Sequence, residues 1–74
     1  MSATARRLAA GHLTPRERFN LRLICRPFGA EIGEVDIILA RRFVEAGMAC
    51  EIVRSERTTW MAPLPSAPAT GSAS

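Results

Sequence analysis

Three side chains near the start of the chain are suited to recognising nucleic acid. Arg18, Asn20 and Arg22 occupy alternate positions, so in an extended strand they would project from one face. Arginine makes paired hydrogen bonds to guanine and asparagine to adenine, and a two-stranded ribbon fits the major groove of DNA. The same row could bind an acidic protein surface, or it could be an ordinary solvated strand face. Four further arginines would contact phosphates or the acidic partner, namely Arg6, Arg7, Arg16 and Arg26.

Two segments resemble parts of DNA-binding families. The run Arg18-Phe19-Asn20-Leu21-Arg22 resembles the DNA-reading strand of ribbon-helix-helix repressors, in which two such strands pair across a dimer. Residues 39–64 are similar to the last helix and the hairpin wing of a winged-helix domain. Both resemblances imply a DNA-binding regulator, and the first implies one that acts as a dimer.

The polar row requires a strand over residues 18–26. Apolar residues alternate with the polar ones in this segment, with Ile24 as the exception, and Pro27 would end the strand because it has no amide hydrogen to donate. Residues 14–17, Thr-Pro-Arg-Glu, match a helix capping box with proline at the first helical position. The alternation outweighs this signal, so we expect at most a single helical turn before the strand. The alternating apolar residues are Phe19, Leu21, Leu23 and Cys25.

The clearest predicted element is a helix over residues 33–47. Glu34 and Asp36 would lie in its first turn, where carboxylates oppose the positive end of the helix dipole. Gly47 would close its last turn, with Met48 completing a Schellman motif. Spacings of three and four residues place four apolar residues on one buried stripe, namely Val35, Leu39, Phe43 and Ala46.

Three apolar residues of this helix, Ile37, Ile38 and Val44, lie outside the buried stripe. A helix that is apolar over most of its circumference needs cover on more than one side. The predicted ordered core, residues 18–61, is also close to the size of about 40 residues below which chains usually need a partner, a metal or disulfides. We therefore predict that these three residues form an interface with another copy of the chain or with a larger assembly.

The remaining pattern completes a small α+β domain. Alternation predicts a second strand over residues 48–53, and β-branched and aromatic residues predict a third over residues 58–61. The predicted architecture is a two-layer β-α-β-β domain in which one helix packs on a short sheet and a right-handed crossover makes the first two strands parallel. One sheet face would be left for solvent or a partner. We predict a flexible basic arm over residues 1–13, the domain over 14–62 and a disordered tail over 63–74.

Charge is distributed unevenly along the chain. All ten basic residues are arginine, and six of them lie in residues 1–26 together with one acid. Residues 27–74 carry four arginines and six acids. A basic segment of this kind attracts nucleic acid, acidic proteins or anionic membrane surfaces. It could also pair with the acidic remainder of a neighbouring copy.

The sequence offers little that could support catalysis or metal binding. Cys25 and Cys50 fall on the inward phase of their predicted strands, which favours two buried free thiols in a reducing, cytoplasmic compartment. His12 is expected to be solvated, and its spacing from the cysteines matches no zinc site. No serine or cysteine has a nearby base of the kind that a nucleophile needs. We expect no enzyme activity, cofactor, metal, small-molecule substrate or membrane span, since the apolar runs are far shorter than about 20 residues.

These observations lead to two functional hypotheses. The first is a non-enzymatic interaction module that engages an acidic partner through the arginine-rich strand and self-associates or docks through the apolar helix face. The alternative is a nucleic-acid-binding protein, a ribbon-like or winged-helix-like DNA-binding regulator. The modest net charge of +3 and the acids of the second half weigh against the alternative.

Overall fold

Residues 1–63, which the computed structural model describes, form three helices and three strands. The predicted α+β class is confirmed. The predicted β-α-β-β order is present from β1 onward, but two helices that were not predicted precede it. Along the chain the elements are α1 (Ala3–Ala9), α2 (Pro15–Ile24), β1 (Ala30–Glu31), α3 (Ile37–Glu45), β2 (Cys50–Arg54) and β3 (Arg57–Met61).

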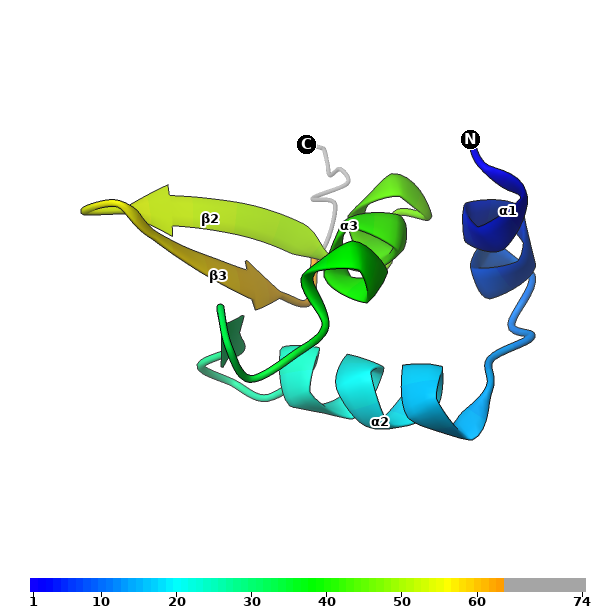
Figure 1. Cartoon of the computed structure of the whole chain (residues 1–74), viewed down its shortest axis with the longest axis horizontal. Coiled ribbons are helices and arrows are strands. Elements are labelled where there is room, and N and C mark those ends of the chain that lie inside the picture. Colours follow the sequence, from blue (N-terminus) through cyan, green and yellow to red (C-terminus); the bar gives the residue numbers. More distant parts are fainter. Residues whose placement is uncertain (64–74) are drawn as a thin grey trace, which may run out of the picture.

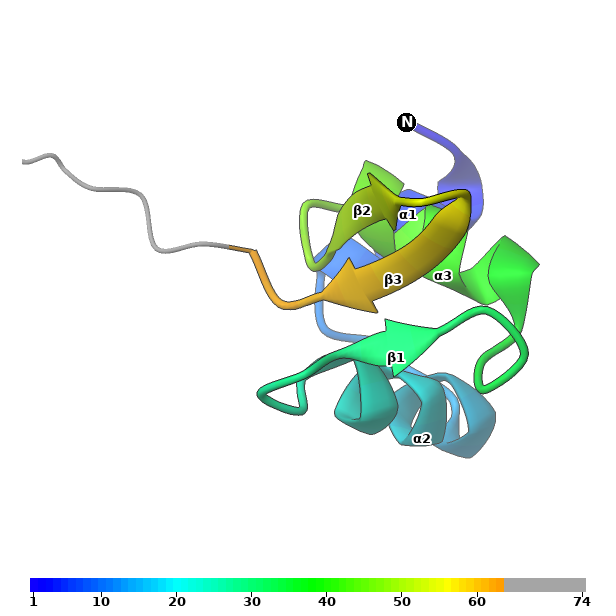
Figure 2. The ribbon, with the colours of Figure 1, turned by 90° about the vertical axis from the view of Figure 1, so that its left-hand side faces the viewer.

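The strands form one antiparallel sheet in the order β1-β3-β2. Ala30 of β1 pairs with Trp60 of β3, and Ile52 of β2 pairs with Thr59 of β3. Figure 1 shows the β2–β3 hairpin projecting to one side of the helices, and Figure 2 looks onto the sheet with helices behind it. The predicted parallel arrangement of the two strands joined by the helix is present, because β1 and β2 both run antiparallel to β3 and α3 connects them. The residues of the first strand were wrongly predicted: it is the short β1 and not residues 18–26, and β3 lies between β1 and β2 in the sheet.

The segment predicted as the first strand is helix α2. It begins with the capping box that the sequence contains: the Thr14 hydroxyl accepts the amide of Glu17, and the Glu17 carboxylate accepts the amide of Thr14. Its buried positions, Glu17, Asn20 and Ile24, follow the helical period. Two of these are polar and Phe19 is exposed. Because polar residues occupy buried positions and an apolar one is exposed, the apolar residues of this helix alternate along the sequence as they would in a strand.

The predicted flexible arm, residues 1–13, contains helix α1. Ser2 caps this helix by accepting the amide of Ala5, and it also donates two hydrogen bonds to the Glu45 carboxylate at the end of α3. Ala5 and Leu8 are fully buried. The sequence signal for this helix is weak, because 7 residues make only about two helical turns and show little periodic repetition of apolar residues.

Helix α3 confirms the clearest sequence prediction but starts later than expected. Asp36 is its N-cap and accepts hydrogen bonds from the amides of Ile38 and Leu39. Glu34 and Asp36 therefore precede the helix instead of lying in its first turn. The physical reason is that the Asp36 carboxylate satisfies amides that have no acceptor within the helix.

The predicted end of α3 is confirmed. The amide of Met48 donates to the carbonyl of Phe43 at 2.8 Å and that of Gly47 to the carbonyl of Val44 at 3.0 Å. This is the Schellman motif, with Gly47 in the left-handed region at φ +79°. The predicted stripe is either buried in the core or packed against it, in the case of Val35, Leu39, Phe43 and Ala46.

The two predicted C-terminal strands are confirmed as the β2–β3 hairpin. Arg54 and Arg57 pair at its turn end. Ser55 and Glu56 form the turn between them, and both have positive φ values, 48° and 66°. Glycine and asparagine adopt this geometry more easily than serine or glutamate. The ladder therefore holds the turn in a backbone conformation that its residues disfavour.

The core takes one large side chain from each helix and one from the sheet. Leu8 of α1, Ile24 of α2, Phe43 of α3 and Trp60 of β3 are fully buried. The predicted ordered core therefore has to be extended to include α1. The indole Nε1–H of Trp60 has no acceptor among residues 1–63, which reduces the stability gained by burying the ring.

Two expectations concern the ends of the chain and the membrane. The predicted disordered tail, residues 63–74, lies outside the described residues except for Pro63. Within the part of the chain that the structure describes, no helix has the length and apolar character needed to cross a bilayer.

Gly29 lies where the loop before β1 approaches β3 most closely. Its φ is +71°, and a β-carbon there would lie 2.5 Å from the Trp60 carbonyl oxygen. Gly29→Ala should therefore lower the free energy of unfolding by more than about 2 kcal/mol, through backbone strain and steric overlap. Gly33→Ala is the matched control, because Gly33 also has a positive φ but open space around its β-position; it should cost about 1 kcal/mol. Urea unfolding followed by Trp60 fluorescence measures both, and equal losses would contradict the close contact.

Candidate binding surface on helix α2

The side chain of Glu17 joins the first two helices. It is only 5% exposed, and its carboxylate accepts two hydrogen bonds from Arg7, at 2.8 and 2.6 Å, and one from the Thr14 amide at 2.8 Å. Arg7 also donates to the carbonyl of His12 at 2.7 Å. Arg7, predicted to contact a partner, is thus engaged inside the protein in a bidentate pair that fixes α1 against α2.

The Glu17 carboxylate is held in its charged form. The hydrogen bond from Arg7 is the main cause, and with the bond from the Thr14 amide it outweighs the effect of burial and lowers the pKa of Glu17 from 4.5 to about 2. The same hydrogen bond raises the pKa of Arg7. Both groups therefore stay ionised at neutral pH, and the joint between α1 and α2 is an ion pair.

Asn20 and Arg16 join α2 to the start of α3. The Oδ1 of the buried Asn20 accepts the amide of Asp36 at 3.0 Å, and its Nδ2 donates to the carbonyl of Arg16 at 2.8 Å. Arg16 pairs with the Asp36 carboxylate at 2.7 Å, and this hydrogen bond is the main reason that the pKa of Asp36 is lowered. Asn20 therefore does not project in a row with Arg18 and Arg22 as predicted, because both ends of its amide are bonded within the protein.

Arg26 closes the loop that connects α2 to β1. Its guanidinium donates to the carbonyls of Leu23 and Gly29, at 3.1 and 3.0 Å, and to the carboxylate of Glu34 at 2.8 Å. The guanidinium also lies over the ring of Phe28, 4.5 Å from the centroid. Like Arg7 and Arg16, this predicted contact residue is engaged in intramolecular bonds.

Arg18 and Arg22 differ from these arginines. Both are exposed, and neither forms an ion pair within residues 1–63. Arg18 donates one long hydrogen bond, to the carbonyl of Leu13 at 3.5 Å. The two arginines lie one turn apart on α2, and Phe19, 61% exposed, follows Arg18 on the same side. Together with Pro15 they line a shallow hollow of about 290 Å³. We call Pro15, Arg18, Phe19 and Arg22 the α2 outer face; α2 runs along the lower edge of the molecule in Figure 1.

Most of the charged residues among residues 1–63 form ion pairs, and those that do not are unevenly distributed over the surface. The acids that form no ion pair within residues 1–63 are Glu51 and Glu56, both in the β2–β3 hairpin. Most of the unpaired positive charge therefore lies on the helices, and the hairpin carries the two unpaired acids together with Arg54. The arginines in ion pairs are Arg7, Arg16, Arg26, Arg42 and Arg57. The exposed arginines without an ion pair in this part of the chain are Arg6, Arg18, Arg22, Arg41 and Arg54.

A second hollow, of about 400 Å³, lies at the corner between α1 and α2. Arg18 lines both this hollow and the α2 outer face. His12 is exposed at the corner, as expected of a solvated residue. The two hollows therefore meet at Arg18 and form one basic region, whose arginines without an ion pair in the described residues are Arg18 and Arg22. The corner hollow is lined by Arg7, Gly11, His12, Leu13, Thr14 and Arg18.

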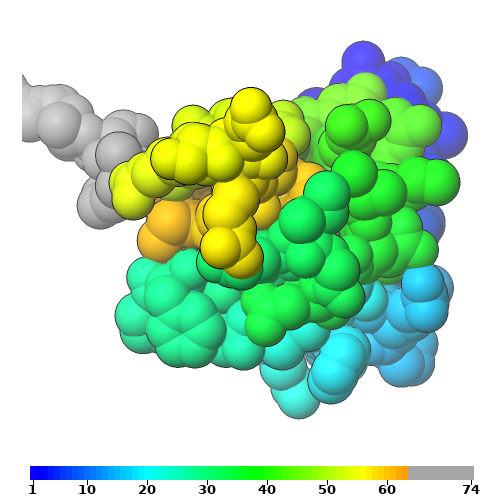
Figure 3. Space-filling view, turned by 60° about the vertical axis from the view of Figure 1, so that its left-hand side comes forward, coloured from blue at the N-terminus to red at the C-terminus, as the bar shows by residue number. Residues whose placement is uncertain are grey.

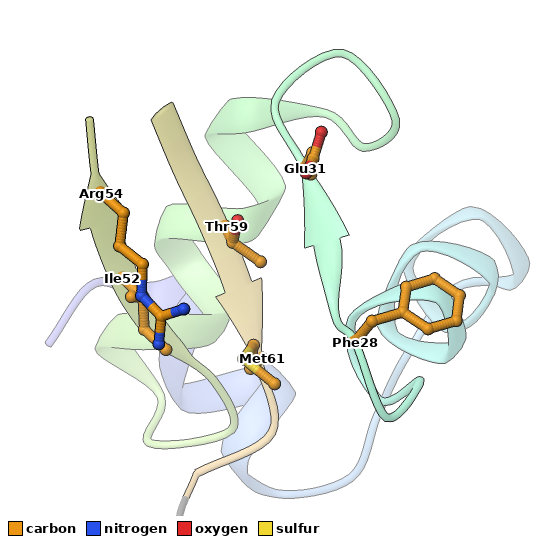
Figure 4. Close-up of a pocket in the computed structure, with 6 residues that line it drawn as sticks. All are labelled: Phe28, Glu31, Ile52, Arg54, Thr59 and Met61. Atoms are coloured by element: carbon orange, nitrogen blue, oxygen red, sulfur yellow. The ribbon is translucent and has the colours of Figure 1, made fainter. Parts of the chain in front are cut away.

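The sheet face that the helices leave open carries a third hollow, of about 340 Å³. In Figure 4, Thr59 and Met61 of β3 lie between Ile52 and Arg54 on one side and Phe28 on the other. Figure 3 shows the orange end of β3 between the yellow hairpin and the teal segment that leads into β1. The lining combines apolar groups with one positive and one negative side chain, Arg54 and Glu31. This face therefore carries less net positive charge than the α2 outer face.

The cysteines differ in exposure and both are free. Cys25 is exposed at the C-terminal cap of α2, and Cys50 is half-buried in β2. The prediction of two buried thiols is wrong for Cys25, because it ends a helix instead of facing inward from a strand. Among residues 1–63 no group of three or more His, Cys, Asp and Glu side chains could hold a metal ion.

The apolar residues predicted as an interface on α3 fall into two groups. Ile38 is 65% exposed, and Ile37 is exposed to a lesser degree. Val44 is half-buried and packs against the core. The exposed apolar patch on α3 therefore consists of Ile37 and Ile38.

No protein-family model, no curated protein and no solved structure matches the chain. The resemblance of residues 18–22 to a ribbon-helix-helix strand is wrong, because these residues are helical. Residues 39–63 do form the end of a helix followed by a hairpin, as the winged-helix resemblance implied, but this order of elements alone carries no argument about function.

Sequence reasoning identified the two arginines of this surface and missed the aromatic ring between them. A spacing of four residues puts Arg18 and Arg22 on one side of a strand or a helix alike. Phe19 was assigned to the inward side of a strand. The signal that could have found it is the capping box at residues 14–17, since a helix starting at Pro15 places residues 15, 18, 19 and 22 on one side.

The Arg7–Glu17 pair makes a prediction about pH. The folded pKa of Glu17 lies below its ordinary 4.5, so its contribution to stability is present at neutral pH and is lost as the pH falls from about 5 to about 2. Glu17→Gln should lower the free energy of unfolding by about 1–3 kcal/mol at neutral pH. The difference from the parent protein should shrink toward zero near pH 2.

Urea unfolding at several pH values, followed by Trp60 fluorescence, measures this difference. Glu56→Gln is the control, because Glu56 is exposed and forms no ion pair within residues 1–63; its effect should be small at every pH. A Glu17→Gln deficit that stayed constant down to about pH 2 would mean that the pair contributes through packing and not through charge.

Proposed function

We propose that the chain is a non-enzymatic binding module that engages an acidic partner through the α2 outer face. The observation that carries the proposal is that Arg18 and Arg22 flank an exposed Phe19 and form no ion pair within residues 1–63. An arginine without such a pair keeps its forked N–H donors available for a carboxylate or a phosphate.

The way α2 is held supports this function. Glu17 ties its first turn to Arg7 of α1, Asn20 ties its middle to the start of α3, and Ile24 anchors its last turn in the core. A helix held at three points presents its outer side chains on a fixed backbone. Binding then costs only the ordering of side chains and not of the main chain.

The charge distribution supports the same class of partner. The net charge is +3, and the two acids without an ion pair among residues 1–63 lie in the hairpin, away from α2 along the chain. A positive region of this kind steers a negative partner during encounter, and the attraction weakens as salt screens it.

The apolar patch on α3 supports a second contact, with another copy of this chain. Ile37 and Ile38 form the patch, and Val44 no longer belongs to the proposed interface because it packs against the core. A two-fold axis at Ile38 would bury the two patches against each other.

Removing the two arginines of the α2 outer face tests the first contact. Arg18→Ala/Arg22→Ala should weaken the binding of labelled polyanions by about tenfold or more, because two charge-assisted hydrogen-bonding groups are lost. Fluorescence anisotropy with polyglutamate, inorganic polyphosphate and a single-stranded oligonucleotide, in a salt series, measures this. The control is Arg41→Ala/Arg54→Ala, which removes the same charge from α3 and β2. Equal losses in the two double variants would mean that only net charge matters and would overturn the proposal.

A charge on the α3 patch tests the second contact. Ile38→Glu should convert a dimer into a monomer in sedimentation equilibrium, because the carboxylate would have to be buried without a partner. Val53→Glu is the matched control: Val53 is also 65% exposed but lies on the hairpin, so this variant should stay dimeric. A parent protein that is monomeric at high concentration, or a dimer that survives Ile38→Glu, would contradict the proposed interface.

A further inference from the structure

We propose that the acidic partner of the α2 outer face is single-stranded nucleic acid, with a base stacked on Phe19 and phosphates bound by Arg18 and Arg22. This inference rests on the proposed function of the same surface and narrows the class of its partner. It gives a role to the exposed aromatic ring of Phe19, which charge attraction alone does not explain.

The ring of Phe19 favours a nucleobase over an acidic side chain. It is 61% exposed between two arginines and lines the hollow of the α2 outer face. The face of an aromatic ring is negative, so it attracts carboxylates poorly. A base stacks on such a ring whatever its sequence identity, because every base has a π-face. An aromatic ring beside positive charges is the combination found in proteins that bind single strands without sequence preference.

The arginines complete the site. A guanidinium can bind a phosphate through two parallel hydrogen bonds and can also stack on a base. Arg18 lines the hollow beside Phe19 and also the neighbouring hollow at His12. A strand whose base stacks on Phe19 can therefore continue past Arg18 into the second hollow without leaving the basic region.

The burial of Asn20 argues for a single strand and against sequence-specific duplex recognition. Asn20 was the predicted reader of adenine, and both ends of its amide are bonded inside the protein. The α2 outer face thus offers stacking and phosphate binding but no amide for base edges. In a duplex each base is already stacked between its neighbours, so a ring such as Phe19 reaches a base face only in an unpaired strand.

Substitution of Phe19 tests the inference. Phe19→Leu keeps an apolar side chain but removes the stacking face, and it should weaken binding of a labelled single-stranded oligonucleotide of about 12 nucleotides by about tenfold or more. Phe19→Trp should bind at least as tightly as the parent. Arg18→Ala should make the salt dependence of binding shallower by about 0.7 in the log–log slope, as expected for one lost phosphate contact. Phe28→Leu is the control, because Phe28 is 68% exposed but lies under Arg26, and it should change affinity less than about twofold.

Polyglutamate, inorganic polyphosphate and duplex DNA serve as probes beside the oligonucleotide. The inference predicts that the single strand binds most tightly and that Phe19→Leu leaves binding of the two base-free polymers unchanged. Tighter binding of polyglutamate, tighter binding of the duplex, or no effect of Phe19→Leu would overturn it. In those cases the proposed function still stands if Arg18→Ala/Arg22→Ala weakens binding selectively. Failure of every polyanion to bind at low salt would overturn the proposed function itself.

Discussion

The arrangement of the helices depends on one buried carboxylate, that of Glu17. It caps α2 by accepting the Thr14 amide, and it accepts the bidentate guanidinium of Arg7 from α1. A carboxylate that loses water on burial is stable only if its acceptor positions are filled. Helix α1 must therefore dock where Arg7 reaches Glu17, and this docking brings Leu8 into the core.

The ion pairs that hold the fold also define its surface. The ion pairs of Arg7 and Arg16 connect α2 to α1 and to the start of α3, and that of Arg26, just after α2, connects it to the loop between β1 and α3. The outer side of α2 carries Arg18 and Arg22, which form no ion pair within residues 1–63. The arginines that stabilise the fold and those of the proposed binding surface are therefore different members of one arginine-rich segment, so substitutions on the α2 outer face test the proposed binding without removing the ion pairs of the fold.

Helix α3 and the β2–β3 hairpin could be predicted from the sequence because their signals are local. The three- and four-residue spacing, the Schellman ending at Gly47 and the alternating strand residues act within a few positions of one another. Helix α2 had an equally local signal, the capping box from Thr14 to Glu17, but its periodicity was obscured. Its buried side includes polar Glu17 and Asn20, and its exposed side includes Phe19, so the apolar pattern was that of a strand.

The sequence by itself determined the α+β class, the main helix, the hairpin and the common side of Arg18 and Arg22, since each follows from spacing along the chain. Only the tertiary structure decided which arginines are exposed without an ion pair, that Asn20 is bonded internally and that Phe19 is exposed. The physical reason is that local sequence patterns relate residues a few positions apart, whereas these features depend on contacts between distant parts of the chain. The Arg7–Glu17 and Arg16–Asp36 pairs join residues on different helices, and their formation depends on how those helices pack, which no local pattern of residues specifies.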